Sequence, residues 1–353
     1  MTYIDARAKT LRHVERSISW DRSHAAPVTV EWDLSNRCIL GCQDCHFAHT
    51  HVRGPWATVP RTLPMAYEST GDLAELDVVR RALGEMAAAG VRSVVWSGGG
   101  EPMTHPQWLE AVEHAASVGL EQGMYTCGGL INPLTGHRLS QLASWVVVSL
   151  DAADGPTYAA DKRVPAWRFD AACEGVRHLV GGRATVGVSY LLHSGNVRRA
   201  YEMVALSRQL GATYTTFRPA VRTSPDAPGV CTDDRQWVWD EMERLETLAT
   251  FDDVEIDPQR FASYAGWKTH GYETCYGVRL HATLTPDGRV WICPQRRGVT
   301  AIGDVSRESF SDVWARHSGA YQVDDACRVL CRLHPINETL AAVHTPRIHE
   351  AFV

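Results

Sequence analysis

The sequence predicts an α/β fold built on a parallel sheet, and two observations carry that prediction. From about residue 28 to residue 220, apolar segments of strand length alternate with amphipathic segments of helical period. Six strands separated by helices favour parallel pairing, because a helical crossover lets the next strand run in the same direction. The 353 residues are also enough to bury a sizeable core.

The composition of each segment and the residues at its ends define these elements. The expected strands are residues 28–34, 91–97, 122–126, 145–151, 184–192 and 213–219. The expected helices are residues 71–89, 107–118, 169–179 and 197–210. Gly90 and Gly119 directly follow the first two of these helices, and glycine at that position commonly ends a helix.

Two regions break the alternation. Residues 46–70 contain Pro55, Pro60 and Pro64, and a loop of that length is usually functional or disordered. After about residue 222 we expect a helix over residues 232–248 and then a hairpin with Asp287-Gly288 as its turn. A domain boundary is therefore expected between about residues 222 and 270.

Composition narrows the possible classes of partner. The formal net charge of −6 argues against nucleic acid or an anionic membrane as the main partner. No apolar run approaches the roughly 18–20 residues that a membrane span needs, and the first residues lack a signal-peptide core. We expect a cytoplasmic protein, in which clustered cysteines serve metal binding or catalysis and not disulfides.

The first cysteine group directly follows the first expected strand. Cys38, Cys42 and Cys45 have the spacing Cys-x3-Cys-x2-Cys. Three thiolates on one loop can hold three irons of a 4Fe–4S cubane, which leaves the fourth iron open to a substrate or cofactor. Zinc is the alternative, with His46 or His49 as a further ligand.

This motif, placed after a first strand, resembles that of the radical S-adenosylmethionine (radical SAM) superfamily. The resemblance implies a partial (β/α)6 TIM-like barrel within residues 1–222, starting at about residue 20. It also implies that S-adenosylmethionine chelates the open iron. An electron from the cluster then cleaves the sulfonium, and the resulting 5′-deoxyadenosyl radical abstracts hydrogen from a substrate.

Further segments match the family in order along the chain. The segment Ser-Gly-Gly-Gly-Glu-Pro over residues 97–102 resembles its Gly-Gly-Glu motif. The resemblance implies that S-adenosylmethionine is contacted by Gly99, Gly100 and Glu101 (methionyl amine), Ser149 and Asp151 (ribose), Lys162 or Arg163 (methionyl carboxylate) and Asn196 (adenine). Most of these positions lie at the ends of strands, where barrels of this kind place their chemistry.

A second cysteine group lies near the C-terminus. Its members are Cys275, Cys293, Cys327 and Cys331, which are enough to ligate one cubane or one structural zinc ion. The Gly-x4-Cys hairpin and the later cysteine pair resemble the twitch domain, a shortened SPASM domain. The resemblance implies one auxiliary cluster, which transfers electrons or orders the substrate cavity. The chain would then hold two 4Fe–4S clusters in all. The expected division is a barrel over 1–222, a helical linker over 223–269 and a small C-terminal twitch domain over 270–353.

The three remaining cysteines have different expected roles. Cys173 lies among apolar residues at helical spacing and is expected in the core. Cys127 ends the third strand, where a thiol could return a hydrogen atom to a substrate radical. A small residue that merely fits is the alternative for Cys127. Cys231, in the loop after the sixth strand, is a second candidate donor.

Basic side chains are expected around the substrate. Arg218 lies on the sixth strand and His49 follows the cluster loop, and together with neighbouring histidines and Arg222 they would suit a phosphate or carboxylate. A solvated loop is the alternative for any single histidine. The expected partners are a small-molecule substrate and, from the family resemblance, an electron donor such as flavodoxin or ferredoxin.

The leading hypothesis is radical epimerisation of a sugar-like or nucleoside metabolite in natural-product biosynthesis, with Cys127 or Cys231 as hydrogen donor. The second hypothesis is alcohol dehydrogenation, with the auxiliary cluster accepting an electron. Peptide modification ranks lower, because only about 27 residues precede the first strand and a leader-peptide-binding domain would need more. A non-enzymatic protein with two zinc sites ranks lowest.

Overall fold

The structure is a computed structural model of the chain. It describes residues 6–18, 26–42, 45, 73–220, 235–265, 270–297, 301–324, 327 and 331–344. Three residues predicted near the site, His49, Arg222 and Cys231, lie outside these ranges, as does the proline-containing segment 46–70.

The described residues form one large sheet with the strand order β11-β10-β9-β1-β2-β3-β4-β5-β6-β7. The predicted strands are β1 (Thr29–Asp33), β2 (Ser93–Ser97), β3 (Glu121–Thr126), β4 (Trp145–Ser149), β5 (Thr185–Leu192) and β6 (Tyr214–Pro219). Each pairs in parallel with the next, as the alternation predicted. A short β7 (Val254–Glu255) extends the sheet beside β6.

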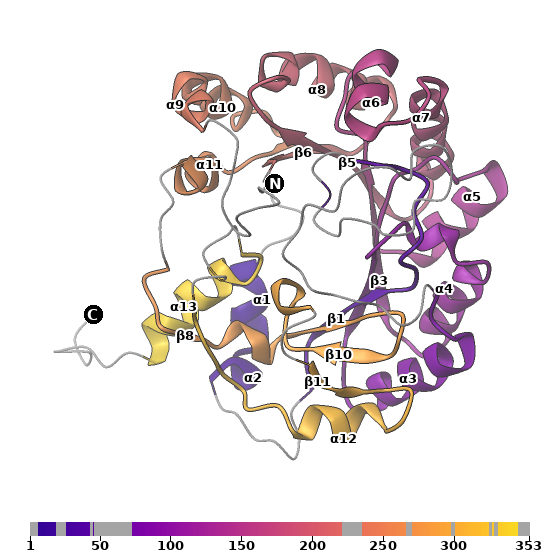
Figure 1. The fold of residues 1–353 in the computed structure, drawn as a ribbon, viewed down its shortest axis with the longest axis vertical. Coiled ribbons are helices and arrows are strands. Elements are labelled where there is room, and N and C mark those ends of the chain that lie inside the picture. Colours follow the sequence, from indigo (N-terminus) through magenta and orange to yellow (C-terminus); the bar gives the residue numbers. More distant parts are fainter. Residues whose placement is uncertain are drawn as a thin grey trace.

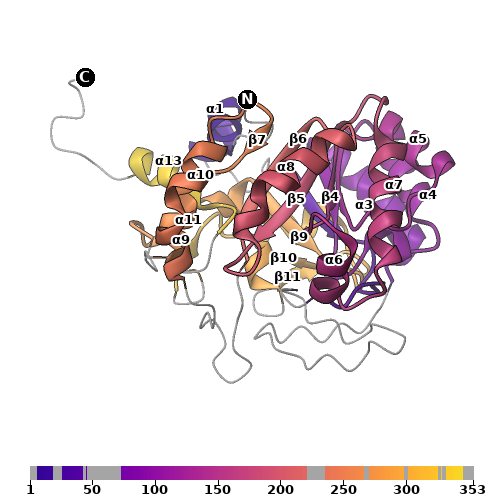
Figure 2. The ribbon, with the colours of Figure 1, turned by 90° about the horizontal axis from the view of Figure 1, so that it is seen from above.

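Helices cover the outside of the curved sheet (Figures 1 and 2). They are α3 (Leu76–Ala88), α4 (Trp108–Ser117), α5 (Pro133–Leu142), α6 (Gly155–Lys162), α7 (Trp167–Leu179) and α8 (Ala200–Gln209). Short 3-10 turns, η1 (Pro102–Thr104) and η2 (Val197–Arg199), follow β2 and β5. This arrangement confirms the α/β partial barrel.

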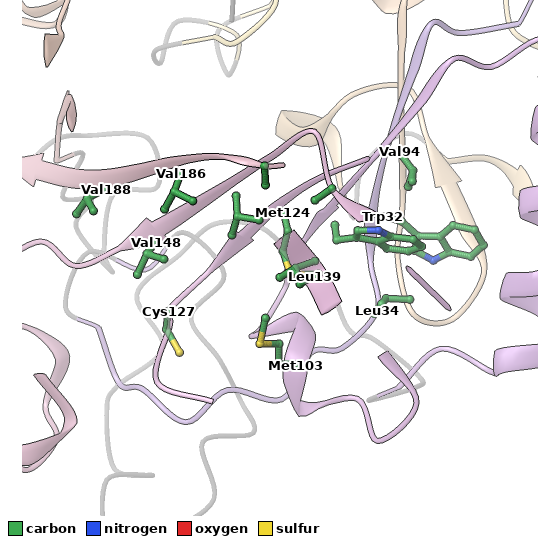
Figure 3. Packing of buried hydrophobic residues seen from close by; sticks show 14 of the residues in the cluster. Trp32, Leu34, Val94, Met103, Met124, Cys127, Leu139, Val148, Val186 and Val188 are labelled. Atoms are coloured by element: carbon green, nitrogen blue, oxygen red, sulfur yellow. The ribbon is translucent and has the colours of Figure 1, made fainter. Parts of the chain in front are cut away.

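The main core lies between the helices and the outer face of this sheet (Figure 3). Trp32 on β1 stacks on Trp96 of β2 at 6.4 Å between ring centroids, and Val94 and Met124 are buried beside them. Because successive strand residues point to opposite faces, the other residues of each strand face the inside of the barrel. On β1 these inward residues are Glu31 and Asp33.

The C-terminal hairpin joins the same sheet. It consists of β9 (His281–Leu284) and β10 (Arg289–Trp291), with the predicted turn at Gly288, whose φ of +84° favours glycine. The sequence did not predict that β9 pairs in parallel with β1, so the chain returns to the first barrel strand. On the far side of β10 lies β11 (Ala301–Asp304), followed by α12 (Phe310–Ala315).

The remaining elements flank the second cysteine group. They are β8 (Thr274–Cys275), β12 (Tyr321–Gln322), the turns η3 (Gly277–Arg279) and η4 (Pro294–Arg296), and helix α13 (His334–His344). The N-terminal helices α1 (Ala6–Arg12) and α2 (Val14–Ile18) pack against α13. No helix in the described ranges has the length and apolarity to cross a bilayer.

Three helical features differ from the expectations. Helices α5 and α6 were not predicted, because they are short and polar, although Asn132 and Asp154 cap their first turns. The expected helix over 232–248 is two helices where the structure describes it, α9 (Gln236–Asp240) and α10 (Met242–Leu248). They are separated at Glu241, whose backbone leaves helical geometry while its carboxylate binds Arg198 and Arg244. Helix α11 (Pro258–Ala265) follows and lies against β6.

Candidate functional site

The three-cysteine loop leaves the C-terminal end of β1. Cys38 and Cys42 are half-buried and pack against the main core, and the backbone N–H of Cys45 donates to the Cys42 carbonyl at 3.4 Å. Burial raises the pKa of Cys38 well above its ordinary value, and the nearby Cys42 and Glu101 raise it further. A bound iron, which stabilises thiolates, would offset that cost.

The glycine segment after β2 packs directly against the start of this loop. The Gly100 N–H donates to the Ser35 carbonyl and the Glu101 N–H donates to the Arg37 carbonyl, each at 2.8 Å. A Cβ on Gly100 would lie 2.1 Å from the Arg37 carbonyl oxygen, a contact that needs the two backbones to move apart. The glycine here is therefore required by the close approach of two loops.

Glu101 is buried and its carboxylate is extensively bonded. It accepts hydrogen bonds from the Thr126 hydroxyl at 2.8 Å, the Cys127 N–H at 2.6 Å and the Met103 N–H at 3.3 Å. These bonds join the end of β2 to the end of β3. The predicted contact between Glu101 and the methionyl amine stays a prediction.

A buried ion pair fixes the loop from its other side. Lys162, at the end of α6, pairs with Asp151 after β4, and its carbonyl accepts the Gly41 N–H at 2.8 Å. Burial alone would lower the pKa of Lys162, but Asp151 and Cys42 beside it raise that pKa well above the ordinary value. Lys162 is thus a permanent cation next to Cys42, which suits an anionic iron–sulfur cluster.

The other predicted cofactor contacts lie around the same barrel end. Ser149 ends β4 half-buried on the inner face, and Arg163 follows Lys162 in the left-handed region. Asp151 accepts the Leu191 N–H at 2.8 Å in addition to its pair with Lys162. The Asn196 amide donates to the Leu191 carbonyl at 2.9 Å and so closes the turn after β5. The structure brings these residues together, and their contacts with the cofactor stay predictions.

Cys127 is buried at the end of β3, near Met103 (Figure 3). Its thiol lies beside Glu101 and Cys38, and burial raises its pKa well above the ordinary value. The side chain is therefore a neutral thiol that keeps its hydrogen. Cys173 is buried in α7 as expected.

The second cysteine group gathers where β8, the hairpin and α13 meet. Cys275, Cys293 and Cys331 share one small apolar cluster with Leu333 and Ile336. Hydrogen-bond donors reach the sulfurs of Cys275, Cys331 and Cys327. The Asn337 amide lies 3.0 Å from the Cys275 sulfur, the Leu333 N–H lies 3.3 Å from that of Cys331, and Arg296 lies 3.7 Å from that of Cys327.

Donors aimed at sulfur stabilise thiolates and tune iron–sulfur clusters. This donor set therefore fits a thiolate-ligated group at the second cysteine group. In the described part of the chain, no three Cys, His, Asp or Glu side chains gather closely enough to hold a single metal ion. A cubane does not require that, because each cysteine binds a different iron.

A buried charge network that the sequence did not predict connects the second cysteine group to β1. Arg297 donates to Glu31 at 2.8 Å and to Asp33 at 3.0 Å, and Arg332 donates to Glu31 at 2.5 Å. Burial would raise the pKa of Glu31, but Arg332 and Arg297 hold it below its usual range. The sequence feature that could have indicated this network is the pair of acidic residues, Glu31 and Asp33, on a mostly apolar strand.

The comparisons with known proteins agree with this geometry. The sequence matches the radical SAM superfamily over residues 32–206 and the SPASM iron–sulfur cluster-binding domain over residues 275–332. The chain belongs to the radical SAM superfamily. Its radical SAM domain binds a 4Fe–4S cluster and S-adenosylmethionine, and its SPASM domain carries the auxiliary iron–sulfur site.

Curated relatives of this radical SAM chain include enzymes with different products. The AdoMet-dependent heme synthase of Methanosarcina barkeri is 22% identical over 309 residues, 82% of each chain. The mycofactocin maturase MftC of Mycobacterium tuberculosis is 26% identical over 316 residues, 85% of this chain and 73% of the relative. The PqqA peptide cyclase of Streptomyces rochei is 24% identical over 337 residues, 89% of this chain and 83% of the relative.

Solved structures confirm the radical SAM fold at low identity. Streptococcus suis SuiB bound to its precursor peptide SuiA superposes with a TM-score of 0.62 at 14% identity, covering 91% of this chain and 69% of SuiB. The enzyme anSMEcpe with bound AdoMet and the Cp18Cys peptide gives a TM-score of 0.58 at 14% identity, covering 89% and 88%.

Proposed function

We propose that this radical SAM enzyme modifies a peptide. The observation that carries the proposal is the set of relatives that match most of the chain, among which are PqqA peptide cyclases and mycofactocin maturases. The superposed SuiB and anSMEcpe structures hold peptides, which agrees with the same fold accepting such a substrate. Peptide modification, ranked lower from the sequence, thus has more support than epimerisation or dehydrogenation of a small molecule.

The inner face of the sheet offers a surface for such a substrate. Val95, Tyr125, Ser149, Leu191 and Arg218 occupy inward positions on successive strands and stay half-buried, whereas their outward neighbours are buried under the helices. Water therefore reaches these five positions on the inner face of β2 to β6. A chain lying on this face would be flanked by the three-cysteine loop and by the second cysteine group.

Within this proposal the two cysteine groups keep their predicted roles. Cys38, Cys42 and Cys45 would hold the cluster that binds S-adenosylmethionine, while Cys275, Cys293, Cys327 and Cys331 would hold the auxiliary cluster. When bound, the first cluster and S-adenosylmethionine supply the radical that removes a substrate hydrogen. Lys162 and Glu101 would orient this end of the barrel, because each is fixed by buried partners.

The test uses the anaerobically reconstituted protein with S-adenosylmethionine, dithionite and short peptides encoded near its gene. We expect 5′-deoxyadenosine together with a peptide of altered mass, measured by mass spectrometry. Turnover in deuterated water separates the outcomes. A peptide that loses two hydrogens indicates cross-linking, whereas one solvent deuterium at unchanged oxidation state indicates epimerisation.

The control is Cys38→Ala, which should form neither product. Epimerisation or dehydrogenation of a sugar or nucleoside, with every peptide unmodified, would contradict the proposal. In that case Cys127→Ala would show whether its thiol is the hydrogen donor: it should retain 5′-deoxyadenosine formation and lose the epimer.

A further inference from the structure

Three arginines from distant parts of the sequence meet at the inner face of the barrel. Arg218 lies near the end of β6, Arg260 lies on α11 and Arg332 directly follows Cys331. The guanidinium carbons of Arg218 and Arg332 lie 5.9 Å and 5.7 Å from the ring centroid of Tyr125 on β3. One Arg218 nitrogen also lies 3.4 Å from the Tyr125 hydroxyl.

Arg260 lies on α11, which packs against β6, the strand that carries Arg218. Burial lowers its pKa to about 10, and the next largest contributions come from the positive charges of Arg218 and Arg332. Three like charges held this close repel one another, and each prefers the solvated or paired state. Holding these three charges together therefore costs free energy unless an anion binds beside them.

The carboxylates of the chain compensate these arginines incompletely. In the described ranges, no ion pair joins Arg218 or Arg260 to a carboxylate, and the hydrogen bond of the Arg218 side chain goes to the Tyr125 hydroxyl. Glu255 on β7 and Asp257 before α11 act on them only at longer range, and burial raises the pKa of Glu255. Glu31 pairs with Arg332 but is shared with Arg297.

The side chains of this group keep part of their surface accessible to solvent. The Arg332 side chain stays 41% accessible although its partner Glu31 is only 1% accessible. Arg218, Arg260 and Tyr125 are half-buried. A ligand on the inner face can therefore contact guanidinium groups without unfolding any element, and arginine binds carboxylates through paired N–H donors.

We propose that Arg218, Arg260 and Arg332 bind a carboxylate of the substrate beside Tyr125. This inference rests on the proposed function for the source of the carboxylate, which would be an acidic side chain or the C-terminus of a peptide. The site lies near the C-terminal end of β6 and next to the second cysteine group. It would hold the acidic group there and so fix which residue of the peptide faces the three-cysteine loop.

The test measures binding to the reconstituted holoenzyme by equilibrium dialysis. The probes are acetyl-Ala-Ala-Glu-Ala-Ala-amide, its Gln counterpart, acetyl-penta-alanine with a free C-terminus, glutarate and inorganic phosphate. We expect at least one carboxylate peptide to bind about tenfold more tightly than the neutral peptide, because charge-assisted pairs are the strong ones. Preference for the Glu peptide or for the free C-terminus identifies the source.

Substitutions of Arg218 and Arg260 test whether these side chains bind the carboxylate. Arg218→Gln and Arg260→Gln should each abolish most of the preference for carboxylate, while Arg260→Lys should retain part of it. Arg307→Gln, which changes an arginine on the surface, should bind as the wild type does. Iron content and the thermal midpoint show whether each variant is folded. If Arg218→Gln does not fold, the binding measured with Arg260→Gln tests the inference.

Equal binding of the neutral and acidic peptides would overturn the inference, and so would tighter binding of phosphate than of any carboxylate probe. Binding needs no turnover, so failure of the proposed function is a separate result. Carboxylate binding by an enzyme that modifies no peptide contradicts the function and leaves the site standing. A modified peptide whose KM is unchanged in Arg218→Gln and Arg260→Gln contradicts the site alone.

Discussion

At the scale of single residues, the inner positions of β1 are the most unusual feature. Glu31 and Asp33 are fully buried carboxylates on the strand that leads into the three-cysteine loop. Two arginines from the C-terminal segment satisfy Glu31, whereas Asp33 has only Arg297 as an ion-pair partner in the described part. The two carboxylates should therefore respond differently to pH.

Asp33 predicts a pH dependence of stability. Burial raises its pKa to about 7, although Arg297 acts in the opposite direction. Between pH 4 and pH 7 the folded state then holds a proton that the unfolded state has lost. The contribution of Asp33 to stability is accordingly present at low pH and falls as the pH rises towards 7.

The measurement is the thermal midpoint of the wild type and of Asp33→Asn from pH 4 to pH 8. The difference, wild type minus variant, should decline across this interval and level off above pH 7. Asp252→Asn, at an exposed position, serves as the matched control and should show no such trend. A difference that rises with pH would contradict the assignment.

At the scale of elements, the close contact between two loops positions the first cysteine group. The glycine segment after β2 and the chain before Cys38 are joined backbone to backbone at Ser35–Gly100 and Arg37–Glu101. The glycine pattern could be recognised from sequence, since it ends an apolar strand. Which backbone it approaches depends on the neighbouring strand, and no local pattern carries that information.

Gly100→Ala should displace the cysteine loop. Its Cβ would meet the Arg37 carbonyl oxygen at 2.1 Å. We therefore expect the free energy of unfolding to fall by about 1–3 kcal/mol and the iron content after reconstitution to be reduced. Gly84→Ala is the matched control, because Gly84 lies inside α3 and an added methyl group would meet nothing within 4 Å. In that control the free energy of unfolding should rise by about 0.5–1 kcal/mol, and the iron content should equal that of the wild type. Wild-type iron content in Gly100→Ala would refute this explanation.

At the scale of the whole molecule, the C-terminal segment is attached to the barrel by sheet and by charge. Strand β9 pairs with β1, and Arg297 and Arg332 reach the inner face of the same strand. The second cysteine group is thereby held next to the barrel interior. This attachment predicts that the two regions unfold together.

Arg297→Met tests that attachment. The substitution leaves Glu31 and Asp33 buried with one partner fewer, and breaking a buried pair typically costs about 3–5 kcal/mol. Urea unfolding is followed by far-UV circular dichroism and by cluster absorbance. The midpoints of the two transitions should shift by the same amount. Arg307→Met, which removes a surface pair with Asp304, should cost less than about 1 kcal/mol. Separate transitions for the two signals would show that the regions are independent.

Features that depend on local pattern could be predicted from the sequence. The alternation of apolar and amphipathic segments predicted β1 to β6 and four of their helices, and cysteine spacing predicted both cysteine groups. These patterns are readable because strand and helix periods are properties of neighbouring residues. The short helices α5 and α6 escaped because their polar residues carry little periodicity.

The contacts between distant segments could be known only from the folded chain. It brought β9 beside β1, set Arg297 and Arg332 against Glu31, and gathered Arg218 and Arg260 around the barrel interior. The partners in these contacts come from different strands, helices and loops, so their pairing follows from which faces pack together. Of Arg218, Arg260 and Arg332, the sequence predicted only Arg218 as a substrate contact, because the other two reach it from segments that are distant along the chain.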